Sequence, residues 1–212
     1  MSKLLREDLE YAVHCDEQWN VIWPISKTHA HLKWVRENLC HYSTWSMVYN
    51  PVTKKYWVQL KNPKKHDSST WWKWDMWVAW HNCYIQENDE YRYLDFEENL
   101  QKEAEEEIWI QIEMFKDFDD FKKTYKSLNK GSVWFVFDKF LYDTWFNKEW
   151  VWLWFIATCE TNLNFTDNEV VDFKWFSSNE LLEFINSDHN ICDPLKLVYE
   201  KAEKFRKEKL DC

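Results

Sequence analysis

A helix is predicted in the middle of the chain, where apolar residues recur at every fourth position. The residues of this series are Phe96, Leu100, Ala104 and Ile108. Because this spacing places them on one face, it predicts a helix over residues 95–108. Apolar repeats near the C-terminus predict two more helices within residues 178–209. Asp193 is expected to cap the second of these, with Pro194 in its first helical position.

Strands are predicted where short apolar, β-branched and aromatic segments alternate with turn signals. They are expected at residues 10–15, 19–25, 45–49, 55–61, 76–81, 109–115, 132–142, 149–160 and in a segment ending at 176. DEQWN turns the first hairpin, and Asn50-Pro51 turns the next strand pair. Residues 26–33 read as a short helix or turn, and residues 117–130 as a polar segment. This mixture predicts an α/β or α+β fold, with a mixed β-sheet sandwiched between helices.

Composition limits the classes of partner. The 212 residues fit a single domain over 1–212, and the net charge of −10 argues against binding to nucleic acid or anionic membranes. No apolar run approaches the roughly 20 residues of a membrane-spanning helix, and the acidic start resembles no export signal. The six cysteines form no CxxC pair and are read as reduced thiols. We therefore expect a cytoplasmic protein, either monomeric or a homodimer.

The balance of glycine and tryptophan is abnormal, with one glycine beside 17 tryptophans. Ordinary usage of about 7% predicts about 15 glycines in a chain of this length. Several tryptophans stand where turns favour glycine, among them Trp19 in DEQWN and Trp72 in STWWKWD. One hypothesis is that UGA codons are read as glycine in the source organism and appear here as tryptophan. The alternatives are a protein that is truly rich in tryptophan and a deliberate substitution.

Three carboxylates share one face of the central helix. In KEAEEEIWI (Lys102–Ile110), Glu103, Glu106 and Glu107 stand at positions i, i+3 and i+4. Like charges at this spacing repel each other unless a cation lies among them. By itself the cluster is compatible with a solvated helix face or with a divalent metal site.

The same stretch resembles the second half of the Nudix box, G-x5-E-x7-R-E-U-x-E-E-x-G-U, where U is aliphatic. Glu103, Glu106 and Glu107 match the three glutamates in this second half of the motif, and Lys102 takes the place of its arginine. The two anchor glycines of the loop-helix-loop over 80–110 are replaced by Trp80 and Trp109. The anchors lie farther apart than in the motif, so IQENDEYRY is interpreted as an insertion. The first glutamate of the motif then falls on Leu94, beside Asp95.

Other segments resemble the Nudix branch related to isopentenyl-diphosphate isomerase. DEQWNVIWPISKTHAHLK is similar to its first hairpin, STWWKWDMWVAWH to its "pGkWD.SvaGH" segment, and FTDNEVVDFKWF to its closing strand. The resemblance implies a Nudix fold that binds Mg²⁺ or Mn²⁺ through Glu103, Glu106 and Glu107. It also implies metal ligands at His81 and Glu149, with His31 and His41 at comparable places. Ordinary hydrogen-bonded or exposed histidines are the alternative, especially for His31 and His41.

The isomerase of this branch needs a cysteine where this chain has Ala79, and Cys83 lies too far along to replace it. The sequence therefore favours a Mg²⁺-dependent hydrolase that cleaves a diphosphate linkage in a nucleoside diphosphate derivative or similar small molecule. Glu103, Glu106 and Glu107 would be its catalytic residues. An isopentenyl-diphosphate isomerase and an inactive Nudix-fold binding module remain as alternatives. Lys61, Lys64 and Lys65 are interpreted either as a solvated run or as groups that steer an anionic substrate.

Overall fold

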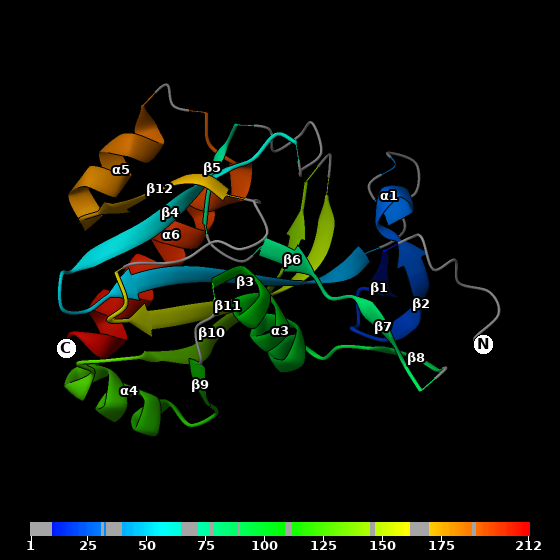
Figure 1. The fold of residues 1–212 in the computed structure, drawn as a ribbon, viewed down its shortest axis with the longest axis horizontal. Coiled ribbons are helices and arrows are strands. Elements are labelled where there is room, and N and C mark those ends of the chain that lie inside the picture. The colour runs from blue at the N-terminus through cyan, green and yellow to red at the C-terminus, as the bar shows by residue number, and fades with distance from the viewer. Residues whose placement is uncertain are drawn as a thin grey trace. The chain divides into compact units, whose positions relative to one another are not determined.

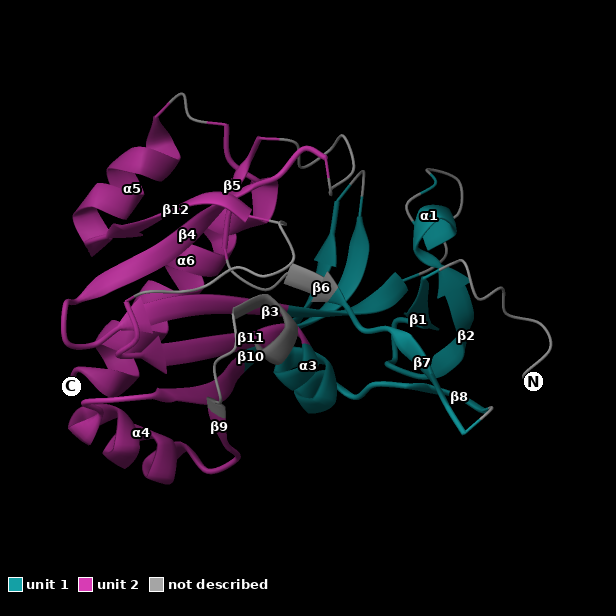
Figure 2. Ribbon diagram, viewed as in Figure 1, with its two compact units in different colours: residues 1–44, 79–102, 138–152 teal, residues 45–78, 103–137, 153–212 magenta. Residues whose placement is uncertain are grey.

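The computed structural model describes residues 10–30, 32, 40–64, 72–76, 79–88, 90–108, 112–144, 147–161, 170–187 and 190–212 (Figure 1). The chain divides into two compact units, one of residues 1–44, 79–102 and 138–152 and the other of residues 45–78, 103–137 and 153–212 (Figure 2). The expectation of one domain over 1–212 stays a prediction. In the described part of the chain, no helix is long and apolar enough to cross a membrane.

The first unit is built around the predicted N-terminal hairpin. Strands β1 (Tyr11–Cys15) and β2 (Val21–Ser26) pair antiparallel, and the short helix α1 (Lys27–Ala30) follows them. β1 also pairs antiparallel with the start of β3 (Cys40–Asn50), and β6 (Ala79–His81) pairs with β3 as well.

A separate two-stranded sheet lies in the same unit. Its strands β7 (Tyr84–Glu87) and β8 (Glu90–Tyr93) pair antiparallel, and Tyr84 meets Tyr93 edge to face at 5.8 Å between ring centroids. The pair occupies most of the segment interpreted as an insertion. The extra residues therefore form a hairpin before the acidic helix.

The large sheet has the strand order β12-β4-β3-β11-β10-β9. Its remaining strands are β4 (Lys55–Lys61), β9 (Ile112–Phe115), β10 (Ser132–Asp143), β11 (Lys148–Thr158) and β12 (Val170–Phe176), while β5 (Trp74–Asp75) pairs with β4. β9 and β10 run parallel, whereas β4 is antiparallel to β3 and to β12. The sheet is therefore mixed, which confirms the predicted combination of a mixed sheet with helices.

The helices are α3 (Phe96–Ile108), α4 (Phe118–Ser127), α5 (Ser178–Asn186), α6 (Asp193–Phe205) and a closing π-helical turn η1 (Arg206–Leu210). In α6, Leu195, Val198, Tyr199 and Ala202 are buried at helical spacing. Tyr199 of this helix meets Tyr56 of β4 edge to face at 5.5 Å. Consecutive buried residues such as Tyr56, Trp57 and Val58 show that both faces of β4 are covered.

Some sequence expectations are corrected. The polar segment 117–130 contains α4, whose first turn is capped by Asp117 and whose Phe121 and Tyr125 are buried. Two apolar residues at i and i+4 are enough to anchor a short helix, and the many charges around them hid the pattern. α6 begins at Asp193 itself and has Cys192 at its N-cap position, without a side-chain cap. The expected strand over 76–81 is represented by β6, while Trp74–Asp75 form β5.

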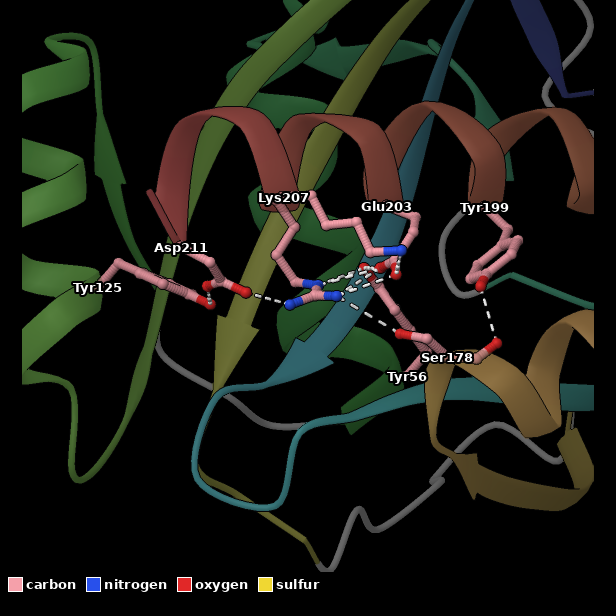
Figure 3. Close-up of polar contacts among 8 residues, drawn as sticks. Tyr56, Tyr125, Ser178, Tyr199, Glu203, Lys207 and Asp211 are labelled. Carbon is pink, nitrogen blue, oxygen red and sulfur yellow. Dashed lines mark hydrogen bonds and ion pairs between the residues drawn. The ribbon is translucent and has the colours of Figure 1, made fainter.

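A buried polar network joins the C-terminal helix to β4 in the second unit (Figure 3). Tyr56 donates a hydrogen bond to Glu203 at 2.7 Å, and Arg206 donates to both oxygens of the same carboxylate at 2.9 and 3.0 Å. Arg206 also binds Asp211, whose carboxylate accepts a bond from Tyr125 at 3.2 Å. These partners satisfy the guanidinium of Arg206, a residue that is only 9% exposed.

Two of the tryptophans singled out in the sequence have left-handed backbone conformations, with φ of 70° at Trp19 and 54° at Trp72. At Trp19 the turn is closed by Asp16, whose carboxylate accepts bonds from the backbone N–H groups of Gln18 and Asn20. Glycine adopts such dihedral angles without steric strain, whereas residues with a Cβ do so at a cost of about 1–2 kcal/mol. Both positions therefore have the backbone expected of glycine. Trp80 lies instead in strand β6, and Trp109 is outside the described residues.

We expect Trp72→Gly to leave the free energy of unfolding unchanged or raise it by about 1 kcal/mol. The substitution relieves the strained backbone, and the indole that it removes is 56% exposed. The neighbouring Trp74→Gly is the matched control, since Trp74 is 8% exposed and packs on Phe184. The Trp74→Gly variant should lose about 3–5 kcal/mol of its free energy of unfolding. Chemical denaturation of both variants measures the difference.

The gene offers a second measurement of the same hypothesis. Codons for Trp19, Trp72, Trp80 and Trp109 are expected to be UGA, while Trp74 and Trp175, which stand in the strand contexts KWD and KWF, are expected to be UGG. UGG at all 17 tryptophan positions would refute the recoding hypothesis.

Candidate functional site

The acidic helix forms where the sequence predicted it. Asp95 caps α3, since its carboxylate accepts a bond from the Glu98 N–H at 2.8 Å while Glu98 accepts one from the Asp95 N–H at 3.0 Å. This reciprocal arrangement is a capping box. Asp95, which neighbours the missing first glutamate of the motif, thus serves as a helix cap. Leu94, at the position of that glutamate, is buried.

The three motif glutamates all lie within α3 (Phe96–Ile108). Glu103 is half-buried, and Ala104 beside it is buried. The side chains of Glu106 and Glu107 fall outside the described ones. The role of the three glutamates as metal ligands stays a prediction.

Three side chains from separate strands meet inside the first unit. They are His41 from β3, His81 from β6 and Glu149 from β11, and one ligand atom of each lies within 4.8 Å of the other two. His41 Nε2 is 3.6 Å from Glu149 Oε1, and the two imidazole rings are 4.6 Å apart between centroids. His41 and Glu149 are buried, and His81 is half-buried. His31 lies outside the described residues.

The donor set of this cluster is suited to a divalent cation. Ligand nitrogens and oxygens lie about 2.0–2.2 Å from a bound zinc or similar ion, which places neighbouring ligand atoms roughly 3–4 Å apart. The 3.6 Å separation of His41 Nε2 and Glu149 Oε1 is within that range. Imidazole together with carboxylate favours Mn²⁺, Zn²⁺ or a similar ion over Mg²⁺, which prefers oxygen ligands. The residues present therefore fit a transition-metal ion.

Asn82 holds the strand of His81 in position through hydrogen bonds. The sequence patterns did not identify this residue. The fully buried amide accepts a hydrogen bond from Thr44 at 3.0 Å and donates one to the Leu94 carbonyl at 3.3 Å. Its backbone N–H donates to the Tyr42 carbonyl at 3.0 Å, and its own carbonyl accepts from Val13 at 2.9 Å. Asn82 thereby joins the end of β6 to β1, to β3 and to Leu94, two residues before α3. A lone asparagine after a histidine is too common a pattern to reveal this from sequence.

Two more polar residues border the cluster. Asn147 donates a hydrogen bond to Glu149, which orients that carboxylate. His14 stands directly opposite His41 in the pairing of β1 with β3, and it is buried. Burial lowers the pKa of His14, and the neighbouring His41 lowers it further. The surroundings therefore favour neutral imidazole at His14.

Cys83 lies beside a carboxylate and a backbone carbonyl group. It lies 3.2 Å from Glu10 Oε1 and 3.2 Å from the His81 carbonyl oxygen. Ala79, at the position of the isomerase cysteine, belongs to β6.

The lysine run is partly reinterpreted by the structure. Lys61 is 4% exposed and forms an ion pair of 3.5 Å with the buried carboxylate of Asp75. It therefore belongs neither to a solvated run nor to an exposed steering surface. Lys64 is exposed, and Lys65 falls outside the described residues.

No family model matches the chain, and no curated protein sequence matches it either. Its structure is similar to the crystal structure of DR0079 from Deinococcus radiodurans, with a TM-score of 0.62 and 16% identity over 91% of this chain and 99% of that one. The MutT protein from Methanosarcina mazei Go1 scores 0.48 with 10% identity, covering 79% of this chain and 95% of the other.

The NUDIX domain of NrtR from Shewanella oneidensis, solved with ADP ribose, scores 0.46 with 8% identity over 77% of this chain and 86% of that domain. Of these three structures, only DR0079 has a TM-score above 0.5. At a sequence identity of 16%, this similarity shows the fold alone. Two of these structures are named as MutT and NUDIX proteins, and membership of the Nudix superfamily and of its isomerase-related branch stays a prediction.

Proposed function

We propose that this chain is a cation-dependent hydrolase that cleaves a diphosphate linkage in a nucleoside diphosphate derivative or a similar small molecule. The observation that carries the proposal is the meeting of His41, His81 and Glu149 in a chain that also resembles the Nudix box. Two imidazoles and a carboxylate form a divalent metal site of ordinary composition. A divalent cation is what an acidic protein needs in order to bind a diphosphate.

The proposed machinery consists of two groups of residues. His41, His81 and Glu149 hold one divalent cation, with Asn147 orienting the carboxylate. Glu103, Glu106 and Glu107 hold one or more Mg²⁺ or Mn²⁺ ions on α3. When bound, such cations offset phosphate charge and lower the pKa of a water molecule that attacks phosphorus.

A carboxylate accepts the proton of the attacking water. Arg92 holds Glu98 at 2.8 Å, and the hydrogen bonds from Arg92 and from the Asp95 N–H lower the pKa of Glu98, which makes it a weaker base. This favours a glutamate of the motif, Glu103, Glu106 or Glu107, as the general base.

An isomerase of the isopentenyl-diphosphate type is the second candidate, and the histidine-rich cluster favours it. His41, His81 and Glu149 match the ligand types that the sequence resemblance implied for that branch. Ala79 opposes it, because a methyl group transfers no proton. An inactive binding module is the third candidate, since Leu94 replaces a motif glutamate and tryptophans stand at both glycine anchors.

A substrate panel tests the proposal directly. Nucleoside diphosphate derivatives and isoprenoid diphosphates are incubated with the full chain in the presence of Mg²⁺, of Mn²⁺ or of a chelator, and products are separated by chromatography. We expect cleavage of at least one compound with either cation and none with the chelator. If every compound stays intact with both cations, the hydrolase proposal fails and the binding module is favoured.

The cluster itself is tested by cation binding. His41→Gln and Glu149→Gln should each lower Mn²⁺ affinity by about tenfold or more, as measured by calorimetry, because each removes one of three ligands. His29→Gln is the matched control, since His29 is exposed and bonds to Ser26 outside the cluster. Unchanged Mn²⁺ affinity in both cluster variants would remove these residues from the metal site.

The isomerase alternative has its own test. Incubation of the protein with isopentenyl diphosphate and Mn²⁺ is expected to yield no dimethylallyl diphosphate, as detected by mass spectrometry after chromatography. The reason is that residue 79 supplies neither an acid nor a base. Formation of that product would overturn the preference for a hydrolase.

A further inference from the structure

Two cysteines face each other across the strand pair that carries His41. Cys15 ends β1 and Cys40 begins β3, and they are direct partners in the antiparallel register. Their sulfur atoms are 3.5 Å apart. Both thiols are free. A contact this close between two thiols far apart in sequence depends on the pairing of the strands.

Hydrogen bonding aligns the two sulfurs. The Cys40 thiol donates to the backbone carbonyl oxygen of Cys15 at 3.1 Å. This leaves the Cys15 thiol as the donor in the sulfur–sulfur contact. Both side chains are buried, with exposures of 0% for Cys15 and 2% for Cys40. Each sulfur is therefore held beside the other, away from bulk solvent.

The geometry is close to that of a disulfide. Directly opposed residues of antiparallel strands have Cβ atoms about 4.5–5.5 Å apart, and disulfides span about 3.5–4.5 Å between Cβ atoms. An S–S bond is about 2.05 Å long, so the sulfurs must approach by roughly 1.5 Å. Small rotations about χ1 of both cysteines, with a slight approach of the strands, provide such a movement.

We propose that Cys15 and Cys40 form a reversible intramolecular disulfide when the protein meets a small peroxide. One thiolate attacks an oxygen of hydrogen peroxide, the O–O bond breaks, and a sulfenic acid and hydroxide result. The second thiolate then attacks the sulfenic sulfur and displaces its hydroxide. In total, two thiols and one peroxide give one disulfide and two water molecules, a two-electron oxidation. A dithiol reductant reverses it by exchange.

Access for the peroxide comes from opening of the strand pair. In the described part of the chain, β1 and β3 share two register pairs, His14 with His41 and Cys15 with Cys40. So short a contact opens at lower free energy than the long strand pairs of the large sheet. Hydrogen peroxide is small enough to enter a brief opening that excludes larger disulfides.

The cross-link leaves the histidine cluster in place. Successive side chains along a strand point to opposite faces, so Cys40 and His41 lie on different sides of β3. The disulfide instead closes a loop over residues 16–39 and restricts the unfolded chain. Oxidation is therefore expected to raise the melting temperature.

The experiment treats the full reduced chain with a small excess of hydrogen peroxide and then counts free thiols under denaturing conditions. We expect the number to fall from six to four, and peptide mapping should identify a linkage of Cys15 to Cys40. The melting temperature should rise on oxidation and return after treatment with dithiothreitol. Six remaining thiols, or a linkage between other cysteines, would overturn the proposal.

Variants separate this pair from the other thiols. Cys15→Ser and Cys40→Ser should each abolish the intramolecular linkage and the rise in melting temperature. Cys83→Ser keeps both cysteines of the pair and should behave as the parent protein does. Cys212→Ser removes the exposed thiol and so tests for linkage between molecules through that residue. Peptide mapping of the unaltered chain identifies the linked cysteines even if a variant folds poorly. If the melting temperature of Cys15→Ser still rises on oxidation, the proposal is contradicted.

Discussion

Glu106→Gln and Glu107→Gln are each expected to lower cation-dependent turnover by roughly 100-fold or more while leaving the chain folded. Several kcal/mol of transition-state stabilisation come from cations that neutralise phosphate charge, and each 1.4 kcal/mol corresponds to about tenfold in rate. Glutamine keeps the size of the side chain but removes the charge that would hold the ion. Steady-state kinetics with the substrate identified in the panel measure the loss.

The stability of the cation-free protein should not fall with the turnover in these variants. Glu103 lies three and four residues before Glu106 and Glu107, so removing one charge relieves a repulsion of about 0.2–0.5 kcal/mol. The melting temperature without cation should therefore hold or rise slightly, while the stabilisation by added Mg²⁺ shrinks. If activity were lost through unfolding, the melting temperature without cation would fall.

Glu105→Gln is the matched control for this experiment. Glu105 belongs to the same helix but occupies the unspecified position of the motif. Its charge is removed in the same way, so any general effect of lowering the negative charge appears in all three variants. If turnover by Glu106→Gln and Glu107→Gln equals that of Glu105→Gln, the assignment of the motif glutamates is wrong.

Glu203→Gln is expected to lower the free energy of unfolding by about 3–5 kcal/mol. The carboxylate is buried between Tyr56 and Arg206, and the guanidinium binds both of its oxygens (Figure 3). Glutamine offers one acceptor oxygen in place of two, and it leaves a buried cation with less compensation. Chemical denaturation of the parent and the variant at neutral pH measures the loss.

The free energy of unfolding that is lost in Glu203→Gln should depend on pH. Burial raises the pKa of Glu203, but hydrogen bonds from Tyr56, Lys207 and Arg206 outweigh it and hold the pKa below its ordinary value of 4.5. A carboxyl whose pKa is lowered on folding stabilises the protein above its unfolded pKa, and this contribution is lost as the pH falls through the folded pKa. The difference between parent and Glu203→Gln should therefore be full at neutral pH and shrink below about pH 4.5.

Glu200→Gln provides the comparison within the same helix. Glu200 lies on the exposed side of α6, and exposed substitutions usually change stability by less than about 0.5 kcal/mol. If Glu203→Gln is as mild as Glu200→Gln, the network contributes no net stability. Neither residue belongs to the proposed catalytic groups, so turnover by the folded fraction should stay unchanged in both.

The sequence by itself determined the features that depend on local patterns. The four-residue apolar series predicted α3 to within one residue at its N-terminal end, and the turn DEQWN predicted the hairpin of β1 and β2. Trp19 and Trp72 were singled out from turn chemistry, and both have positive φ. Such features can be read from sequence because side-chain periodicity and backbone dihedral angles are set by neighbouring residues.

Local sequence patterns left open which distant side chains meet, although the resemblance to the isomerase-related branch had named His41, His81 and Glu149. The strand expected at 45–49 begins at Cys40, and this extension brings His41 into a buried strand beside His81 and Glu149. Tyr56 and Glu203 are 147 positions apart, yet they share a hydrogen bond. Periodicity shows which face of an element is apolar, but the partner of each polar group depends on strand order and register. These are set when the whole sheet assembles, because burying a polar group is favourable only where another strand or helix supplies its partner.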